Sequence, residues 1–115
     1  MAPPNTHSLF AYGTLLERET RLSVLGHDCP HRMASLHGVS VRQGRWPYLI
    51  PAKAETKGML LLNLSDRDME ALDKYEDVAE RLYAREKKHV VLSDGSSMPA
   101  WVYFPNLANW LKEWL

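Results

Sequence analysis

The sequence predicts an α+β fold built on a mostly antiparallel sheet or small barrel, with two or three helices. Five or six short apolar runs have the length of strands and are bounded by turn-forming residues. Two or three other segments carry apolar residues at helical spacing. Because these strands and helices do not alternate regularly along the chain, a doubly wound parallel sheet is disfavoured.

The first half of the chain is predicted to contain one helix. Residues Met1 to His7 have the composition of a loose tail, and an apolar strand follows from Leu9 until the chain breaks at Tyr12-Gly13-Thr14. A helix is expected from Glu17 to Leu25, because Gly26 supplies a C-terminal stop. The next segments are predicted to be a loop at 27–31, a strand at 33–42 broken by Gly38, and an irregular loop with an edge strand at 43–51.

The second half of the chain predicts a strand, a helix and a hairpin. The apolar run from Glu55 to Leu64 has strand length. Ser65 and Asp68 form an S-x-x-D capping signature, so a helix is expected from Asp66 to Tyr75. The remaining segments are predicted to be a strand at 83–92, a hairpin turn at 93–96, a strand at 98–104 and an amphipathic helix at 107–115.

Length, composition and charge indicate one globular domain spanning residues 1–115. The chain is 45% hydrophobic, and its 14 Lys and Arg residues equal its 14 Asp and Glu residues. Without net charge, no long-range field draws the chain to nucleic acid or to an anionic membrane, so a small or neutral partner is expected. A single cysteine, no signal-peptide pattern and no membrane-length apolar run favour a cytoplasmic location. Nothing in the sequence predicts an oligomeric state.

Glu76 is the first candidate for chemistry. Met69 and Leu72 define the buried stripe of the capped helix, and a further step of four residues reaches Glu76. A carboxylate in a partly apolar pocket has a raised pKa, which suits proton transfer. The structural alternative is that Glu76 lies past the helix end, where it turns to solvent or pairs with Arg81 or Arg85.

The turn after the first strand is the second candidate. A strand that ends sharply at Gly13 exposes successive backbone N–H groups, which can hold a carboxylate or an oxyanion. The structural alternative is a plain strand-to-helix turn in which Gly13 supplies an unusual dihedral angle and Thr14 acts as a cap. The tripeptide Tyr12-Gly13-Thr14 alone does not decide between the two.

Other clusters favour structure over chemistry. Cys29 and His31 straddle Pro30 in a loop, and no second cluster of metal ligands follows, so a solvated loop with an incidental cysteine is expected. The helical spacing of Trp110 and Trp114 favours packing. The chain lacks G-x-S-x-G, G-x-x-x-x-G-K, G-x-G-x-x-G and H-E-x-x-H, which argues against serine hydrolases, P-loop NTPases, Rossmann enzymes and zincins. No metal site is predicted.

Seven segments, taken together and in this order, resemble the gamma-glutamylcyclotransferase-like family, and more closely its branch related to the plant avirulence-induced proteins. They are FAYGTL at 10–15, VLG at 24–26, WPYLIP at 46–51, KGMLL at 57–61, ALDKYE at 71–76, LYAR at 82–85 and DGSSMPAWVY at 94–103. YGTL followed by LDxYE, YxR and a final A-x-V-Y strand is a specific combination that spans nearly the whole chain.

The resemblance implies a fold and a site. The expected fold is a small mixed or antiparallel β-barrel with two or three flanking helices and a cavity beside the YGTL turn. In enzymes of this family the glutamate of the LDxYE motif, here Glu76, is the general acid/base, and the turn binds the γ-glutamyl part of the substrate. The residues assigned to substrate binding on this basis are Tyr12, Gly13, Thr14, Leu15, Tyr83 and Tyr103.

The implied reaction is the cyclisation of a γ-glutamyl amine or peptide to 5-oxoproline with release of the amine. Glu76 takes a proton from the α-amine and returns it to the departing amine. No cofactor is needed, because the nucleophile belongs to the substrate itself. Two other classes of function stay open: a non-catalytic module that binds a small metabolite in the same cavity, and a protein-interaction domain that uses Trp110 and Trp114.

Overall fold

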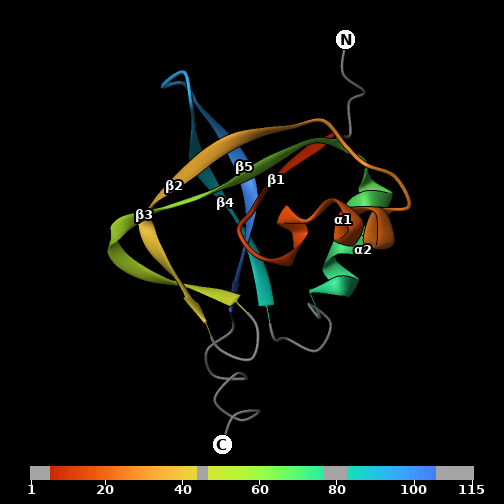
Figure 1. Ribbon diagram of the computed structural model, residues 1–115, viewed down its shortest axis with the longest axis horizontal. Coiled ribbons are helices and arrows are strands. Elements are labelled where there is room, and N and C mark those ends of the chain that lie inside the picture. The colour runs from red at the N-terminus through yellow and green to blue at the C-terminus, as the bar shows by residue number, and fades with distance from the viewer. Residues whose placement is uncertain (1–5, 44–46, 77–82, 106–115) are drawn as a thin grey trace, which may run out of the picture.

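The computed structural model describes residues 6–43, 47–76 and 83–105, and in these ranges it shows five strands, two α-helices and one 3-10 turn (Figure 1). The elements are β1 (His7–Ala11), the 3-10 turn η1 (Thr14–Leu16), α1 (Arg18–Leu25), β2 (His31–Gln43), β3 (Pro47–Leu64), α2 (Asp66–Tyr75), β4 (Tyr83–Leu92) and β5 (Ser97–Pro105). The α+β class predicted from the sequence is confirmed. The helix predicted at 107–115 lies outside the described residues.

The five strands close into a barrel in the order β1-β3-β2-β4-β5. All neighbouring pairs are antiparallel except β1 and β5, which run parallel. The barrel is therefore mixed. The hairpin predicted around residues 93–96 is confirmed, because β4 and β5 pair in antiparallel register on either side of it.

At 43–51 the predicted edge strand is confirmed, because residues 47–51 pair with β2 alone, whereas the described residues on either side of 44–46 are strand and not irregular loop. β2 reaches Gln43 and β3 starts at Pro47, and the two strands pair along almost their whole length, with a register shift beside Gly38. Proline is tolerated at position 51 because this part of β3 pairs with β2 alone, whereas β1 pairs with β3 only from Met59 onward. The proline side chains therefore do not end the strand.

Gly58 allows β1 to pack closely against β3. A Cβ atom at this position would overlap the backbone oxygen of Ala11 and lie 2.8 Å from a ring carbon of Phe10. Since no side chain fits there, glycine is required for the close approach of the two strands. This contact fixes the end of β1, immediately before the chain turns at Tyr12.

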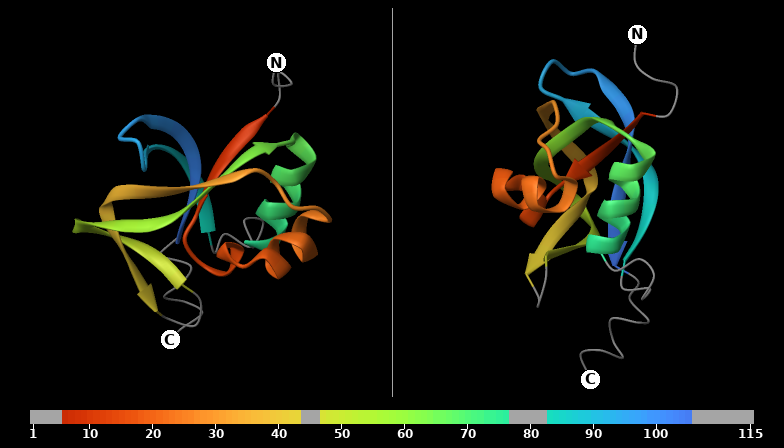
Figure 2. Two further views of the ribbon diagram at one scale, coloured as in Figure 1. Left: turned by 45° about the horizontal axis from the view of Figure 1, so that its top comes forward. Right: turned by 90° about the vertical axis from the view of Figure 1, so that its right-hand side faces the viewer.

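The two helices lie side by side against one side of the barrel (Figure 1 and Figure 2). The predicted bounds of α2 are confirmed, and so is its capping box: Ser65 Oγ accepts from the Asp68 N–H at 3.0 Å, and Asp68 Oδ2 accepts from the Ser65 N–H at 2.9 Å. α1 starts at Arg18, one residue after the predicted start, and stops at Gly26, which has the left-handed conformation.

Two buried clusters result from the alternation of side chains along the strands. One cluster takes residues from all five strands, including Phe10, Leu60 and Val102, and fills the barrel. The other contains Leu61 and Leu72 and lies between the barrel and the helices. Because consecutive strand residues point to opposite faces, Leu60 and Leu61 serve different clusters. α2 is thereby held against the outside of the barrel through Met69 and Leu72.

His7, which the sequence placed in a loose tail, is the first residue of β1. It pairs with Leu64, and its ring Nε2 lies 2.6 Å from Asp66 Oδ1, so contacts with β3 and α2 order it.

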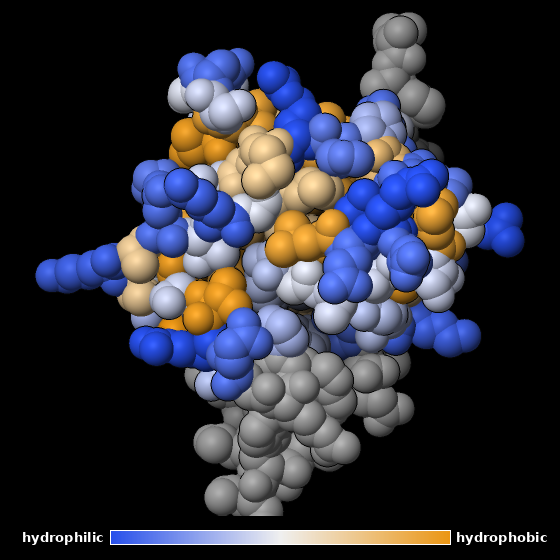
Figure 3. All heavy atoms as spheres, viewed as in Figure 1, coloured by the Kyte–Doolittle hydropathy of each residue, from blue (hydrophilic) through white to orange (hydrophobic). Residues whose placement is uncertain are grey.

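The surface of the face seen in Figure 1 is mainly hydrophilic, with small separate apolar patches (Figure 3). Within the described ranges, no helix has the length and apolar character needed to cross a membrane.

Candidate functional site

One cavity lies where the end of β1, the turn η1 and the C-terminal end of α2 meet. Its volume is about 160 Å³. All seven residues that the sequence analysis assigned to the site line this cavity, together with Pro47 and Tyr75. Glu76 from α2 and the turn at 12–15 therefore border the same space, although they are about 60 residues apart in the chain.

The turn leaves two backbone N–H groups available to a ligand. The carbonyls of Gly13 and Thr14 accept from the N–H groups of Leu16, at 3.0 Å, and Glu17, at 3.1 Å. In a trans peptide the N–H points away from the preceding C=O, so the N–H groups of Thr14 and Leu15 point back toward the start of the turn. Neither has a hydrogen-bond partner within the described part of the chain. Both residues line the cavity.

The structural alternative for the turn is wrong in one of its details, the cap. Gly13 has a φ of −123° with a ψ of −133°, a pair outside the helical and extended regions. A Cβ at Gly13 would make an ordinary van der Waals contact with the Pro47 side chain at 3.5 Å, and glycine leaves that space open. Thr14 makes no side-chain cap; its hydroxyl lies 2.5 Å from the Tyr75 hydroxyl, so it links the turn to the end of α2.

Arg21 holds the turn from the side of α1. This arginine is buried, with 3% of its surface exposed. Its Nη1 donates to the carbonyls of Leu16, at 2.8 Å, and Leu15, at 3.2 Å, and its Nε donates to Asp28 Oδ1 at 2.9 Å. Sequence analysis missed Arg21, because an arginine in a short amphipathic helix resembles the solvent-facing residues beside it.

Glu76 is half-buried at the C-terminal cap of α2. Its N–H donates to the Leu72 carbonyl at 2.9 Å, so the residue continues the helix geometry and its side chain borders the cavity rather than turning away to solvent. Of the two arginines considered as its partner, Arg85 is bound by Asp73 at 2.8 Å, and Arg81 lies outside the described residues.

Three tyrosines of the cavity use their hydroxyl protons within the protein. Tyr12 donates to the Tyr103 carbonyl at 2.6 Å, Tyr83 to the Pro47 carbonyl at 2.8 Å, and Tyr103 to Asp73 Oδ1 at 2.6 Å. Burial raises the pKa of each phenol well above its usual range, and the negative charge of Glu76 raises it further. Among the described residues that line the cavity, Glu76 is the one carboxylate and is therefore the candidate for proton transfer.

Alkaline titration checks the state of these phenols. We expect Tyr12, Tyr83 and Tyr103 to stay protonated in the folded protein through pH 10 to 11, because their pKa values lie above the ordinary value of about 10. The unfolded chain ionises at the ordinary value, so stability falls as the pH rises above it. The chain has five tyrosines. The phenolate absorbance should therefore stay well below the value for five ionised tyrosines until circular dichroism shows that the protein has unfolded. Ionisation of all five in a folded protein would contradict this.

Two further residues near the site were missed from the sequence. Asp73 binds Tyr103 and Arg85, and Tyr75 binds Thr14. Both lie within the segment ALDKYE, on the last turns of α2. Their spacing from Glu76 was visible, but their partners come from β4, β5 and the turn, and only the folded chain brings them together.

The loop at 27–31 is solvated at His27, Pro30 and His31, as predicted, but Cys29 is buried. Cys29 is buried in the cluster between the barrel and the helices, and burial raises the pKa of its thiol. His27 Nε2 lies 2.8 Å from Asp68 Oδ1, which ties the loop to the cap of α2. No group of three potential metal ligands comes together among the residues that the structure describes.

The link between His27 and α2 makes stability depend on pH. The Asp28 carbonyl and then the Asp68 carboxylate raise the pKa of His27 above its usual value. A raised pKa means that the stabilisation is complete below the unfolded value of about 6.5 and disappears as the pH rises through the folded value. We therefore expect His27→Gln to reduce the free energy of unfolding in urea more at about pH 5.5 than at about pH 8.5. An equal reduction at both would contradict this prediction.

The chain matches a known protein family over almost its whole length. A sequence profile described as gamma-glutamyl cyclotransferase, AIG2-like, matches residues 9–114. The chain belongs to this family. AIG2-like protein D from Arabidopsis thaliana is 33% identical to the chain over 94 residues, which are 78% of this chain and 60% of that protein. The chain thus spans about 60% of the length of this curated relative.

Solved structures related to the AIG2-like family have the same fold. An Arabidopsis thaliana protein solved in solution has a TM-score of 0.78 and 23% identity, covering 95% of this chain and 83% of its own. A protein titled gamma-glutamyl cyclotransferase has a TM-score of 0.79 and 15% identity, covering 89% and 68%. A yeast gamma-glutamyl cyclotransferase specific to glutathione has a TM-score of 0.66 and 13% identity, covering 88% and 69%. At these identities the likeness establishes the five-stranded mixed barrel with two helices.

Proposed function

We propose that the protein is a cofactor-independent gamma-glutamylcyclotransferase that converts a γ-glutamyl amine or peptide to 5-oxoproline and the free amine. The observation that carries the proposal is that Glu76 and the N–H groups of the turn border one small cavity. Membership of a family that includes such enzymes supports it. The partner in this proposal is a small γ-glutamyl molecule.

In the proposed mechanism the substrate is folded so that its α-amine faces its own γ-carbonyl carbon. Glu76 removes a proton from the α-ammonium group, and the nitrogen lone pair attacks the carbonyl carbon to close a five-membered ring. Protonated Glu76 then gives this proton to the departing nitrogen, and the bond between the γ-carbon and that nitrogen breaks. The regenerated Glu76 carboxylate takes the second proton, which the ring nitrogen loses as the lactam forms, and passes it to the released amine. The products are 5-oxoproline and the amine in its ammonium form, and Glu76 returns to the carboxylate.

The turn holds the γ-glutamyl part of the substrate in this proposal. The N–H groups of Thr14 and Leu15 point toward the start of the turn and donate to substrate oxygen atoms. Arg21 prevents the turn from rearranging, because it fixes the carbonyls that follow those donors. Gly13 leaves room for the substrate between the turn and Pro47.

The cavity tyrosines shape the site and do not transfer protons. Their hydroxyls donate to protein acceptors, and their raised pKa values keep them neutral. Tyr12, Tyr83 and Tyr103 therefore form an apolar wall against which the substrate chain can bend. A dry, largely apolar wall also strengthens the interaction between Glu76 and the substrate ammonium group.

The proposal is tested by incubating the protein with γ-glutamyl derivatives of neutral, cationic and acidic amines. We expect at least one derivative to yield 5-oxoproline and free amine in equal amounts, without added metal or cofactor. If a derivative raises the melting temperature but yields no product, the cavity is a binding site and the proposed activity is wrong.

A further inference from the structure

We propose that Asp73 is a positioning residue that holds the Glu76 end of α2 at a fixed place relative to the substrate-binding turn. This inference rests on the proposed function. Asp73 does not line the cavity and is three residues before Glu76 on the same helix. It acts through Glu76 rather than on the substrate.

The Asp73 carboxylate binds both strands of the β4–β5 hairpin. Its Oδ1 accepts from the Tyr103 hydroxyl at 2.6 Å and from Arg85 Nε at 2.8 Å. Arg85 and Tyr103 are register partners on neighbouring strands, so the two donors reach the carboxylate from one place on the barrel. Arg85 is itself held over the Trp101 ring, with its Cζ 4.4 Å from the ring centroid.

The same hydrogen bonds continue to the turn. The carbonyl of Tyr103 accepts from the Tyr12 hydroxyl at 2.6 Å, and Tyr12 is the first residue after β1 and borders the cavity. A continuous path therefore leads from the helix that carries Glu76, through Asp73 and Tyr103, to the residue that starts the turn. The Thr14–Tyr75 pair also joins the two sides of the cavity, at its exposed rim.

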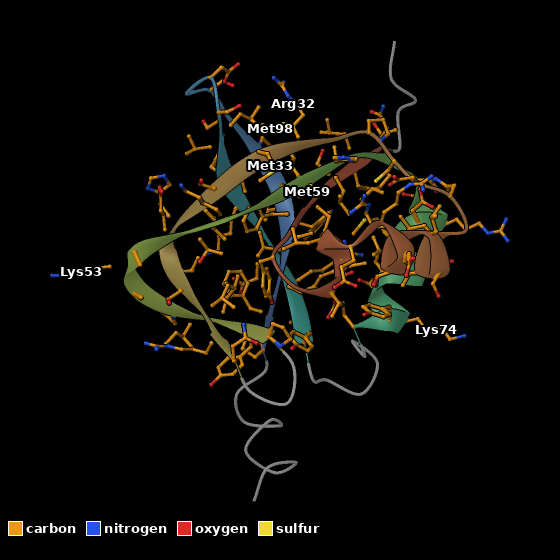
Figure 4. All side chains as sticks on the ribbon, viewed as in Figure 1. Arg32, Met33, Lys53, Met59, Lys74 and Met98 are labelled. Atoms are coloured by element: carbon orange, nitrogen blue, oxygen red, sulfur yellow. The ribbon has the colours of Figure 1, made fainter. Side chains whose placement is uncertain are left out.

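The last turn of α2 depends on this contact more than the rest of the helix does. Met69 and Leu72 are buried, and the capping box fixes the first turn. After Leu72 no residue of α2 is fully buried, Tyr75 is 41% exposed and Lys74 points to solvent (Figure 4). Without Asp73 the helix should stay folded while its end shifts. A displacement of about 1 Å at a catalytic group can lower the rate about 100-fold.

The hydrogen bond between Tyr103 and Asp73 also changes the role expected for Tyr103 in the site. The sequence resemblance assigned it to substrate binding, and its ring does border the cavity. Its hydroxyl, however, is already bound to Asp73. The inference therefore assigns the hydroxyl to positioning and leaves only the ring for the substrate.

The test compares kcat and KM for Asp73→Asn, Asp73→Ala, Tyr103→Phe and the double variant Asp73→Ala with Tyr103→Phe. Glu70→Gln, an exposed carboxylate on the same helix, is the matched control. We expect kcat to fall about 10- to 100-fold in Asp73→Ala, with KM changed less than about threefold. Asp73→Asn keeps one acceptor for Tyr103 and should recover part of this loss. The double variant should be no slower than Asp73→Ala, because both changes break the same contact.

Each outcome bears on the inference in a definite way. If Asp73→Ala lowers the melting temperature but keeps the wild-type kcat well below that temperature, Asp73 is only structural and the inference is wrong. Losses that multiply in the double variant would also contradict it, since the two residues would then act separately. If the wild-type protein turns over no γ-glutamyl derivative, the proposed function fails and this inference fails with it.

Discussion

Glu76→Gln is expected to lower kcat about 100- to 10,000-fold, the usual contribution of a general acid/base, with little change in KM. The amide has nearly the same size as the carboxylate, so the cavity should keep its shape. It cannot accept the proton of the α-ammonium group, however, and the cavity tyrosines are held as neutral hydrogen-bond donors. The measurement is the initial rate of 5-oxoproline formation with the best substrate of the panel.

Glu70→Gln provides the control for this prediction. Glu70 is exposed on the same helix and does not border the cavity, so the same chemical change should leave kcat unaltered. Circular dichroism should show that both variants are folded. If Glu76→Gln is as active as the wild type, another group moves the proton and the mechanism is wrong.

Arg21→Met is expected to have the largest effect on stability, lowering the free energy of unfolding by about 1 to 3 kcal/mol. The substitution leaves the buried Leu15 carbonyl without its donor and removes the donor of the part-buried Leu16 carbonyl. Methionine fills much of the same volume, so a cavity does not explain the loss. Urea unfolding at neutral pH measures it.

Arg18→Met is the matched control, because Arg18 also approaches Asp28. Its Nε lies 3.5 Å from Asp28 Oδ2, but 72% of its side chain is exposed. An exposed pair of this kind contributes about 0 to 1 kcal/mol, so Arg18→Met should be nearly neutral. Equal losses in the two variants would show that burial of Arg21 does not determine its contribution.

Sequence signals that act over a few residues predicted much of the fold. The S-x-x-D pattern at Ser65 predicted the start of α2, Gly26 predicted the end of α1, and the turn residues at 93–96 predicted the β4–β5 hairpin. At 43–51 the edge strand was predicted, and the irregular loop was added because proline was read as a breaker. Whether Pro51 fits a strand depends on how many neighbours that strand has, and this is decided by distant segments.

The residues of the candidate site were also predicted only in part. Glu76 was visible because helical spacing continues the Met69 and Leu72 stripe, and the motif order of the family added the turn. Arg21 and Asp73 were not visible. Asp73 meets Tyr103 across 30 residues of sequence, and Arg21 is a charged residue in a position where charge is ordinarily exposed. Only the packed structure shows that these side chains hold the two sides of the cavity.

The most direct test of the account is a structure of Glu76→Gln with its γ-glutamyl substrate bound, since this variant should bind the substrate and not consume it. We expect the γ-glutamyl group in the cavity, with its α-amine beside position 76 and its oxygen atoms bound by the N–H groups of Thr14 and Leu15. A substrate bound elsewhere, or bound in the cavity with its α-amine turned away from position 76, would contradict the account.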